Sequence, residues 1–383
     1  MSTPLLTPTE GSEQRPPREP ESAQGGFSVW ILRIISALVI PGVLFLFFVT
    51  LRFLRDPETS KLLQVAVAVV VGVGGVWALY WAMDRAVSLL PERAAVGVRP
   101  YAFAGPAMIL LGFYLVYPAV NTFILSFQDS DGRQFVGLAN YERVFTESLY
   151  LTSMRNSVLW AIVVPLVCVI VGLAFATLAD RLPRRSEAFS KSLIFLPMAI
   201  SFVGASVVWR FVYSFRPEGF GEQIGVLNAI WVGLGNDPVQ WLASQPWNNL
   251  FLMVILIWLQ TGFAMVVLSS AIKSVPEELL EAARIDGANE WNVFRRIVVP
   301  SIASTIVVVW TTVLIMTWKV FDIVFVMTRG RDGTTVVAER MVTEFFTFDN
   351  DGMGATLAVL LFLAVVPILI INIKRFREQE AIR

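Results

Sequence analysis

Long apolar runs constrain the fold of this chain more than any other feature. A bilayer core about 30 Å thick is crossed by a helix of ~20 mostly apolar residues, and eight runs of roughly that length occur here. Each run is apolar nearly all round, as expected for helices that face lipid or a bundle interior. We therefore predict an all-α, polytopic membrane protein with about eight transmembrane helices. The runs are Val29–Leu51, Leu62–Met83, Tyr101–Phe127, Asn156–Ala179, Phe189–Tyr213, Leu250–Ile272, Ile302–Met327 and Ala355–Ile373.

Composition narrows the classes of function. Hydrophobic residues make up 56% of the chain and charged residues only 16%, whereas about a quarter of the residues of a soluble domain are charged. The formal net charge is zero, so nothing indicates a nucleic-acid partner. Histidine is absent and Cys168 is the only cysteine, so the commonest metal ligand, the commonest general base and any disulfide are missing. These counts disfavour a metalloenzyme or a hydrolase and predict no metal site.

The distribution of Lys and Arg predicts the orientation, because these residues concentrate in cytoplasmic loops. Fifteen lie between runs two and three, four and five, six and seven, and after run eight, whereas eleven lie in the opposite loops. Both termini and the loop between runs six and seven are therefore predicted to be cytoplasmic. Residues 1–27 are polar and predicted to be a disordered cytoplasmic tail, and residues 375–383 form a second tail. The long loops 128–155 and 214–249 would lie outside, where they favour docking of an external protein.

The loop 274–300 joins the sixth and seventh runs and has the pattern of two short helices. Ser274 and Glu277 fit a capping box with Pro276 in the first turn. Gly287 is the natural left-handed stop for this first helix. A second helix is predicted from about Glu290 to Val298, and Pro300 then opens the seventh run.

Two interpretations of this loop stay open from its residues alone. In one, it is an amphipathic turn at the membrane surface in which Glu281 pairs with Arg284 three residues later. In the other, it is a rigid knob that fits a groove on another protein, with Ala282 and Ala283 permitting close approach.

A family resemblance favours the second interpretation. Glu281-Ala-Ala, three residues, Gly287, nine residues and Ile297-x-x-Pro300 together resemble the EAA loop of permease subunits in binding-protein-dependent ABC importers. The residues around this pattern are most similar to carbohydrate importers of the maltose, alpha-glucoside and glycerol-phosphate type. The similarity covers about Tyr101 to Lys374 and departs at Val299, where Leu is usual, and at Arg329–Gly333, where relatives often have a Gly-rich turn with Pro. Further matching segments are Ile285–Ala288, Trp291, Phe294, Val136–Tyr141, Phe195–Pro197, Ile257–Phe263 and Phe321–Thr328.

The resemblance implies an ABC importer type I permease fold, with a six-helix core at 101–374 and a coupling loop at 274–300. Residues 28–95 would be two additional N-terminal transmembrane helices with no assigned role. The resemblance also implies a heterodimer with a second permease in the inner membrane of a bacterium. A cytoplasmic ATPase dimer and an extracytoplasmic solute-binding protein that delivers a sugar would complete the importer. The residues implied to couple to the ATPase are Glu281, Ala282, Ala283, Asp286, Gly287 and Pro300.

The sequence predicts a transport subunit rather than an enzyme. It contains no Gly-x-x-x-x-Gly-Lys-Ser/Thr phosphate loop, so ATP and Mg²⁺ would be used by the partner ATPase and no cofactor is expected on this chain. A secondary transporter of a small polar solute is the alternative, but no carboxylate lies deep in a run, where a coupling ion would need one. A membrane enzyme is disfavoured because the runs hold neither His nor clustered carboxylates.

Polar groups within the runs are candidates for the substrate pathway, because such groups are expensive in a membrane. Gln260 and Phe263 in run six, with Thr317 and Trp318 in run seven, combine hydroxyl-binding and aromatic chemistry that suits a sugar. For each of these residues taken singly, helix–helix packing is the favoured interpretation. Lys319 and Asp322 are likewise expected to form a structural i,i+3 pair.

Overall fold

The computed structural model describes residues 41–43, 45–57, 59–88, 92–217 and 219–381. The chain divides into two compact units, residues 1–117 and 118–383, which are described separately. Within the described residues every named element is a helix, and an isolated antiparallel bridge joins Gln128 and Phe135. The predicted N-terminal tail lies outside the described residues, as do residues 29–40 and 44 of the predicted run Val29–Leu51.

The first unit is built on helix α2 (Lys61–Ser88), which packs against α3 (Glu92–Leu111). The Tyr80 hydroxyl of α2 donates a hydrogen bond to the Phe103 carbonyl of α3, and the two rings stack with centroids 6.0 Å apart. The helix Pro41–Leu54 places Phe47 against Gly75, where a Cβ would lie 2.8 Å from the ring. Small residues let apolar helices approach closely in this way.

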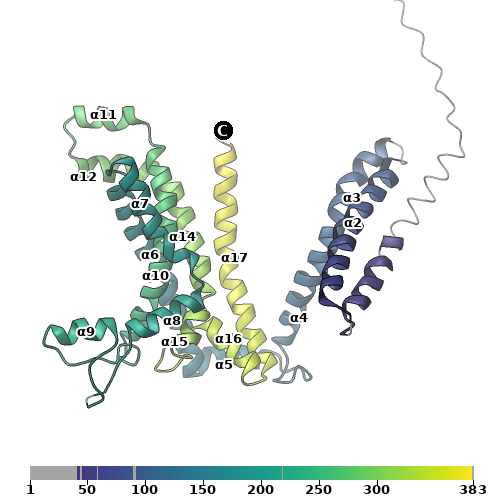
Figure 1. The fold of residues 1–383 in the computed structure, drawn as a ribbon, viewed down its shortest axis with the longest axis horizontal. Helices are drawn as coiled ribbons and strands as arrows, with labels where there is room; N and C mark the ends of the chain where they lie inside the picture. The colour runs from purple at the N-terminus through teal and green to yellow at the C-terminus, as the bar shows by residue number, and fades with distance from the viewer. Residues whose placement is uncertain (1–40, 44, 58, 89–91, 218, 382–383) are drawn as a thin grey trace, which may run out of the picture. The chain divides into compact units, whose positions relative to one another are not determined.

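The π-helical turn η1 (Gly112–Val116) and α4 (Tyr117–Leu125) continue α3 into the second unit. That unit holds most of the helices of the chain (Figure 1). In order they are α5 (Ala139–Thr146), α6 (Ser148–Ala179), α7 (Arg184–Phe195), η2 (Leu196–Ala199), α8 (Phe202–Val212), α9 (Val226–Gly233), α10 (Asn248–Lys273), α11 (Glu277–Ile285), α12 (Glu290–Val293), η3 (Phe294–Val298), α13 (Val299–Ser301), α14 (Ala303–Trp318), α15 (Asp322–Met327), α16 (Val337–Phe346) and α17 (Asp351–Ala381).

The predicted count of about eight spans is not confirmed. Five helical segments of the described residues are long and apolar enough to cross a membrane. Two further candidates are helix pairs bent by more than 40°, so the described residues provide up to seven spans. The five are Lys61–Ser88, Glu92–Leu125, Ser148–Ala179, Asn248–Lys273 and Asp351–Ile370.

Run five is broken, and a second bend lies at the start of run seven; each bend has a local cause. The first pair bends by 102° between Ala199 and Phe202, where Pro197 precedes a turn and Ser201 is extended and caps α8 through Gly204 N–H. The second pair bends by 70° at Ile302, just after Pro300. Because Pro300 has no N–H, it interrupts the helical hydrogen-bond ladder, and the preceding residues form the π-helical turn η3.

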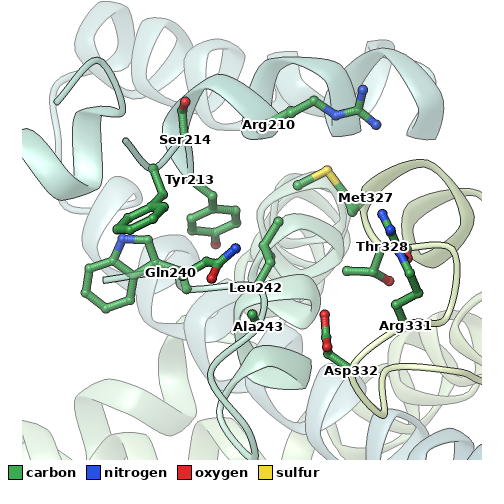
Figure 2. A pocket seen from close by; sticks show the side chains of 12 residues that line it. Arg210, Tyr213, Ser214, Gln240, Leu242, Ala243, Met327, Thr328, Arg331 and Asp332 are labelled. Atoms are coloured by element: carbon green, nitrogen blue, oxygen red, sulfur yellow. The ribbon is translucent and has the colours of Figure 1, made fainter. Parts of the chain in front are cut away.

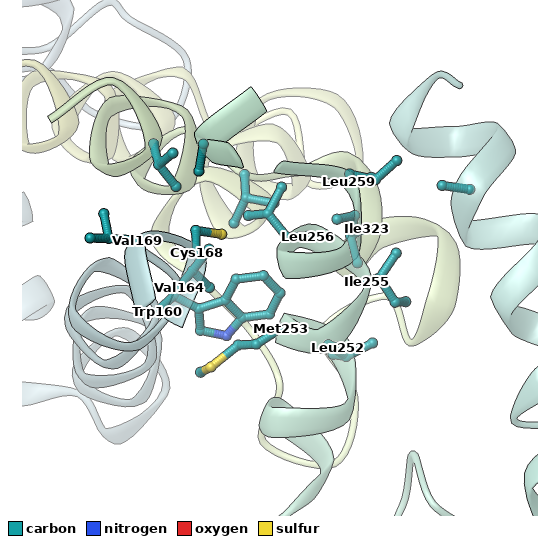
Figure 3. Close-up of a cluster of buried hydrophobic side chains, with 14 of the residues drawn as sticks. Trp160, Val164, Cys168, Val169, Leu252, Met253, Ile255, Leu256, Leu259 and Ile323 are labelled. Atoms are coloured by element: carbon teal, nitrogen blue, oxygen red, sulfur yellow. The ribbon is translucent and has the colours of Figure 1, made fainter. Parts of the chain in front are cut away.

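The core of the second unit lies between α6 and α10. Their approach is set by Gly172, where a Cβ would lie 2.7 Å from the Ala264 side chain. Gly262 of α10 likewise allows a close approach of α7, because a Cβ at position 262 would lie 2.5 Å from the Ile194 carbonyl oxygen. Close contact between small residues provides van der Waals attraction where lipid supplies little hydrophobic drive. Figure 3 shows side chains that fill this core, among them Trp160, Val164, Cys168, Leu252, Met253 and Leu256.

The two ends of the second unit differ in what they carry. Helices α11 and α12 and the C-terminal end of α17 lie at one end, whereas α5, α8, α9, α15 and α16 lie at the other (Figure 1). We call these the loop end and the far end. This arrangement agrees with the predicted placement of the 274–300 loop and the C-terminus on one side of a membrane.

Candidate functional site

The 274–300 loop contains the predicted helix stop at Gly287. This residue has φ +84°, a conformation that glycine adopts without steric penalty. Gly287 N–H donates to the Arg284 carbonyl and Ala288 N–H donates to the Ala283 carbonyl, at N···O distances of 3.1 and 3.0 Å. This pair of hydrogen bonds is the Schellman motif, so helix α11 ends where the sequence predicts.

The predicted capping box at the start of α11 is wrong. The Ser274 hydroxyl donates to the Ala271 carbonyl at 2.7 Å and so belongs to the end of α10. Pro276 occupies the N-cap of α11, and no side chain caps it. The cap that does form is at α12, where the Asn289 side chain accepts from Asn292 N–H at 2.9 Å. Asn is a preferred N-cap residue, so this signal was present in the sequence and was missed.

The predicted ion pair between Glu281 and Arg284 does not form. Arg284 Nε instead lies 2.9 Å from Glu290 Oε1, which links α11 to α12. The hydrogen bond to Glu290 raises the pKa of the Arg284 guanidinium. Glu281 makes no hydrogen bond or ion pair with the described residues, so its exposed carboxylate is available to another protein.

Helix α11 projects from the bundle (Figure 1), and its apolar side chains are not buried. It contains no buried residue; the Leu279 side chain is 50% exposed and that of Ile285 is 86% exposed. A helix of nine residues has little stability in isolation, and its apolar face would normally pack on something. Ala282, Asp286, Gly287 and Pro300 are exposed and Ala283 is half-buried, so each predicted coupling residue is at least partly accessible.

The four predicted pathway residues do not converge on one site. Thr317 is buried and its hydroxyl donates to the Val313 carbonyl within α14, which satisfies it locally. Phe263 packs on the α6–α10 core, whereas Trp318 packs on a separate apolar cluster around Tyr150. Gln260 Oε1 and Trp318 Nε1 are buried and have no hydrogen-bond partner among the described residues. The expected i,i+3 ion pair between Lys319 and Asp322 is also not formed.

Sequence reasoning missed a cluster of four charged side chains and one serine beside the loop. We call it the loop-end charge cluster, and its members are Asp180, Glu187, Lys191, Ser269 and Lys273. Lys191 Nζ lies 2.6 Å from Asp180 Oδ1, and it also contacts Glu187 and Ser269. Ser269 Oγ lies 2.7 Å from Asp180 Oδ1. The signal available in the sequence was the i,i+4 spacing of Glu187 and Lys191, which does not reveal contacts between helices.

A second missed group lies at the far end on helix α16. In the sequence these residues fall in the predicted external loop between runs seven and eight. Helix α16 buries Glu339 and Glu344. Glu344 Oε1 lies 2.6 Å from Arg340 and 2.7 Å from the Tyr150 hydroxyl of α6. Glu339 accepts hydrogen bonds from the hydroxyls of Thr335 and Thr343. We call these six side chains the far-end network.

Two cavities open at opposite ends of the second unit. At the far end, a cavity of about 300 Å³ is lined by aromatic and polar side chains that include Tyr213, Gln240 and Asp332 (Figure 2). At the loop end, a groove of about 620 Å³ is lined by side chains of α6 and by Trp291 and Phe294. Among the described residues, no group of three or more His, Cys, Asp or Glu side chains is placed to hold a metal ion.

Comparison with known proteins adds to this geometry. Residues 169–379 match the family described as binding-protein-dependent transport system inner membrane component. The chain is 52% identical over 281 residues to the osmoprotective compounds uptake permease protein GgtC of Synechocystis sp., covering 73% of this chain and 100% of that protein. It is 49% identical over 289 residues to the alpha-glucoside transport system permease protein AglF of Rhizobium meliloti, covering 75% and 85%.

Solved structures share the fold. A chain in the crystal structure of a bacterial ABC transporter involved in the import of the acidic polysaccharide alginate superposes with a TM-score of 0.64 at 19% sequence identity. That match covers 75% of this chain and 99% of the other. At this level of identity the likeness concerns the helical architecture alone.

Proposed function

We propose that this chain, which belongs to the family of inner membrane components of binding-protein-dependent transport systems, forms part of the path by which an ATP-driven importer takes up α-glucosides. Membership of this family makes the chain a multi-pass membrane transport subunit. A sugar permease is accordingly expected to work with a second permease, an ATPase dimer and an external binding protein. ATP and Mg²⁺ belong to the ATPase, because this chain has no phosphate loop of its own.

The observation that carries the coupling proposal is the exposed surface of α11. A short helix with open apolar side chains, an unpaired Glu281 and a fixed Schellman stop is suited to dock in a cleft of the ATPase. We call residues 274–300 the coupling loop. Glu281 would meet a basic residue there, and Ala282 and Ala283 would allow the helix to approach closely. The loop continues directly into α10 and, through the bend at Ile302, into α14, so both of these helices would move with it.

The substrate class rests on the names of the relatives. One is named for alpha-glucosides and the other for osmoprotective compounds, at 49% and 52% identity. Disaccharides such as trehalose and sucrose contain an α-glucosyl unit and also act as compatible solutes, so one chemical class satisfies both names. Gln260, Phe263 and Trp318 remain proposed pathway contacts. The unpartnered atoms of Gln260 and Trp318 support this, because buried polar groups normally have a partner.

The orientation is also part of the proposal. The coupling loop and both termini are placed in the cytoplasm and the far end outside, where the binding protein would dock. The excess of Lys and Arg on the loop side supports this placement.

Uptake by the reconstituted importer tests the function. The chain would be co-expressed with the permease, ATPase and binding protein whose genes lie beside its own. The purified complex would be placed in proteoliposomes that contain ATP. ATP-dependent accumulation of labelled trehalose, sucrose or maltose is expected, with glycine betaine as the comparison solute. Accumulation of glycine betaine without any of the three disaccharides would contradict the proposed substrate class.

A further inference from the structure

The loop-end charge cluster joins three helix ends at the point where the coupling loop begins. Asp180 caps the end of α6, Glu187 and Lys191 lie on α7, and Ser269 and Lys273 lie on the last turns of α10. Lys273 is the last residue before Ser274, the first residue of the coupling loop. The coupling loop has two arms: the first follows α10, and the second leads into α14. A force on the first arm therefore reaches the cluster before any other part of α10.

The cluster is balanced in charge and partly shielded from water. It holds two carboxylates and two ammonium groups, so its formal charge is zero. The side chains of Asp180, Glu187 and Lys191 are 13%, 16% and 18% exposed. Lys191 bridges α6, α7 and α10, because its one ammonium group contacts Asp180, Glu187 and Ser269. Removal of the Lys191 charge would leave two carboxylates, both partly shielded from water, with Lys273 as their remaining cation.

Deeper in the bundle, the same three helices are in steric contact without charges. Gly172 seats α6 against α10, and Gly262 seats α7 against α10. The other arm of the coupling loop is held by apolar contacts, since Val293 and Val298 are buried, while Trp291 and Phe294 line a groove of about 620 Å³ together with α6. One arm of the loop is thus joined to three helices by ion pairs and hydrogen bonds, whereas the other borders an open groove beside α6.

We propose that Lys191 and Ser269 are positioning residues that fasten the first arm of the coupling loop to α6 and α7, so that movement of the loop is transmitted to the broken span α7–α8. This inference rests on the proposed role of the coupling loop. The cluster makes the ends of α6, α7 and α10 move as one body. Without it, α11 would still dock on the ATPase, but its movement would be lost in bending at the end of α10.

The test is the number of trehalose molecules imported per ATP hydrolysed, measured on the same proteoliposomes for each variant. Lys191→Met removes the bridging charge, and Arg185→Met is the matched control, because Arg185 is exposed on the same helix and has no ion pair among the described residues. Lys191→Met is expected to lower the ratio about tenfold while ATP hydrolysis and co-purification of the ATPase are retained. Arg185→Met is expected to leave the ratio unchanged.

Two further variants keep the inference open to contradiction if Lys191→Met fails to assemble. Ser269→Ala removes one hydroxyl without changing charge and is expected to lower the ratio two- to fivefold, whereas Lys191→Arg preserves the charge and is expected to recover most of it. An assembled Lys191→Met or Ser269→Ala complex with the wild-type ratio would overturn the proposal, as would an equal loss in Arg185→Met. Failure of the proposed function can be told apart from failure of this inference. In that case binding protein and trehalose do not stimulate ATP hydrolysis by the wild-type complex.

Discussion

The loop-end charge cluster and the far-end network both hold charged side chains between helices, but they differ in burial and in charge balance. Lys273 of the cluster is 51% exposed and the other three charged members are partly shielded, with two cations facing two anions. In the far-end network Glu339 and Glu344 are 3% and 2% exposed, and Arg340 is the one cation paired with them among the described residues. Glu339 relies on two hydroxyl donors instead.

This difference indicates two mechanical roles. Charges near water can exchange partners at small energetic cost, because water and salt screen them. Buried carboxylates that lose a partner have no such replacement. We infer that the far end is locked by pairs whose carboxylates are buried and that the loop end is fastened by partly hydrated pairs, each of which contributes less to stability.

The largest expected effect is on stability at the far end. Arg340→Met removes the partner of buried Glu344 and its contact over the Tyr150 ring. Breaking a buried pair in this way costs about 3–5 kcal/mol, so a marked fall in the Tm of the purified complex is expected in a thermal unfolding assay. Arg155→Met, an exposed position on α6, is the control. A fall no greater than that of the control would show that the far end is not locked by this pair.

A steric change between the two ends should have the next largest effect. Gly262→Ala places a methyl group 2.5 Å from the Ile194 carbonyl oxygen, and such overpacking costs about 1–3 kcal/mol. Gly105→Ala is the matched control, since nothing lies within 4 Å of a Cβ there. The Tm of both variants in the same detergent provides the measurement, and equal values would contradict close packing of α7 on α10.

The same kind of substitution at the loop end should destabilise less. Lys191→Met is expected to cost about 1–2 kcal/mol, between the values for exposed and buried pairs, because its partners remain partly hydrated. The Tm should therefore fall by less than in Arg340→Met, although coupling is affected more. If Lys191→Met lowers the Tm as much as Arg340→Met does, the distinction between a far end with buried carboxylates and a partly hydrated loop end is wrong.

The smallest effect concerns an exposed turn at the far end. Backbone N–H groups of Arg133 and Gln134 donate to Asp129 and lower the pKa of its carboxyl from 3.8. A lowered folded-state pKa contributes stability above the unfolded value, and this contribution is lost as the pH falls below 3.8. Asp129→Asn should therefore lower the Tm slightly at neutral pH, with the two proteins converging in acid. A constant difference from pH 7 to pH 3 would contradict this role for the carboxylate.

Local patterns predicted the parts of the chain that depend on local physics. The long apolar helices and the Gly287 stop follow from hydropathy and from backbone conformation, and both are present. The capping box failed because Ser274 bonds backward to Ala271 within α10. Pro197 lies just before the 102° break, and a proline can kink a span, but the size of the bend is not visible in the sequence.

The two charged networks could not be predicted, because their contacts join residues far apart in the chain. Asp180 and Ser269 are separated by 89 positions and Tyr150 and Glu344 by 194. Only the i,i+4 pairs within α7 and α16 are visible locally, and such pairs are typical of exposed helix faces as well. The role of the proposed pathway residues could not be predicted either, because a polar side chain in a span can face a cavity or a neighbouring helix.

Cross-linking from the coupling loop tests the central proposal most directly. Cys168 is buried and is the only cysteine in the chain, so Ala283→Cys in a Cys168→Ala background gives one accessible thiol. A short bifunctional reagent is expected to join position 283 to the ATPase subunit. Because the loop is proposed to move during transport, less cross-linked product is expected after addition of binding protein, trehalose and ATP. Arg185→Cys should give no such product. Absence of any product from position 283 in an assembled, ATP-hydrolysing complex, while Arg185→Cys cross-links, would contradict the proposed coupling loop.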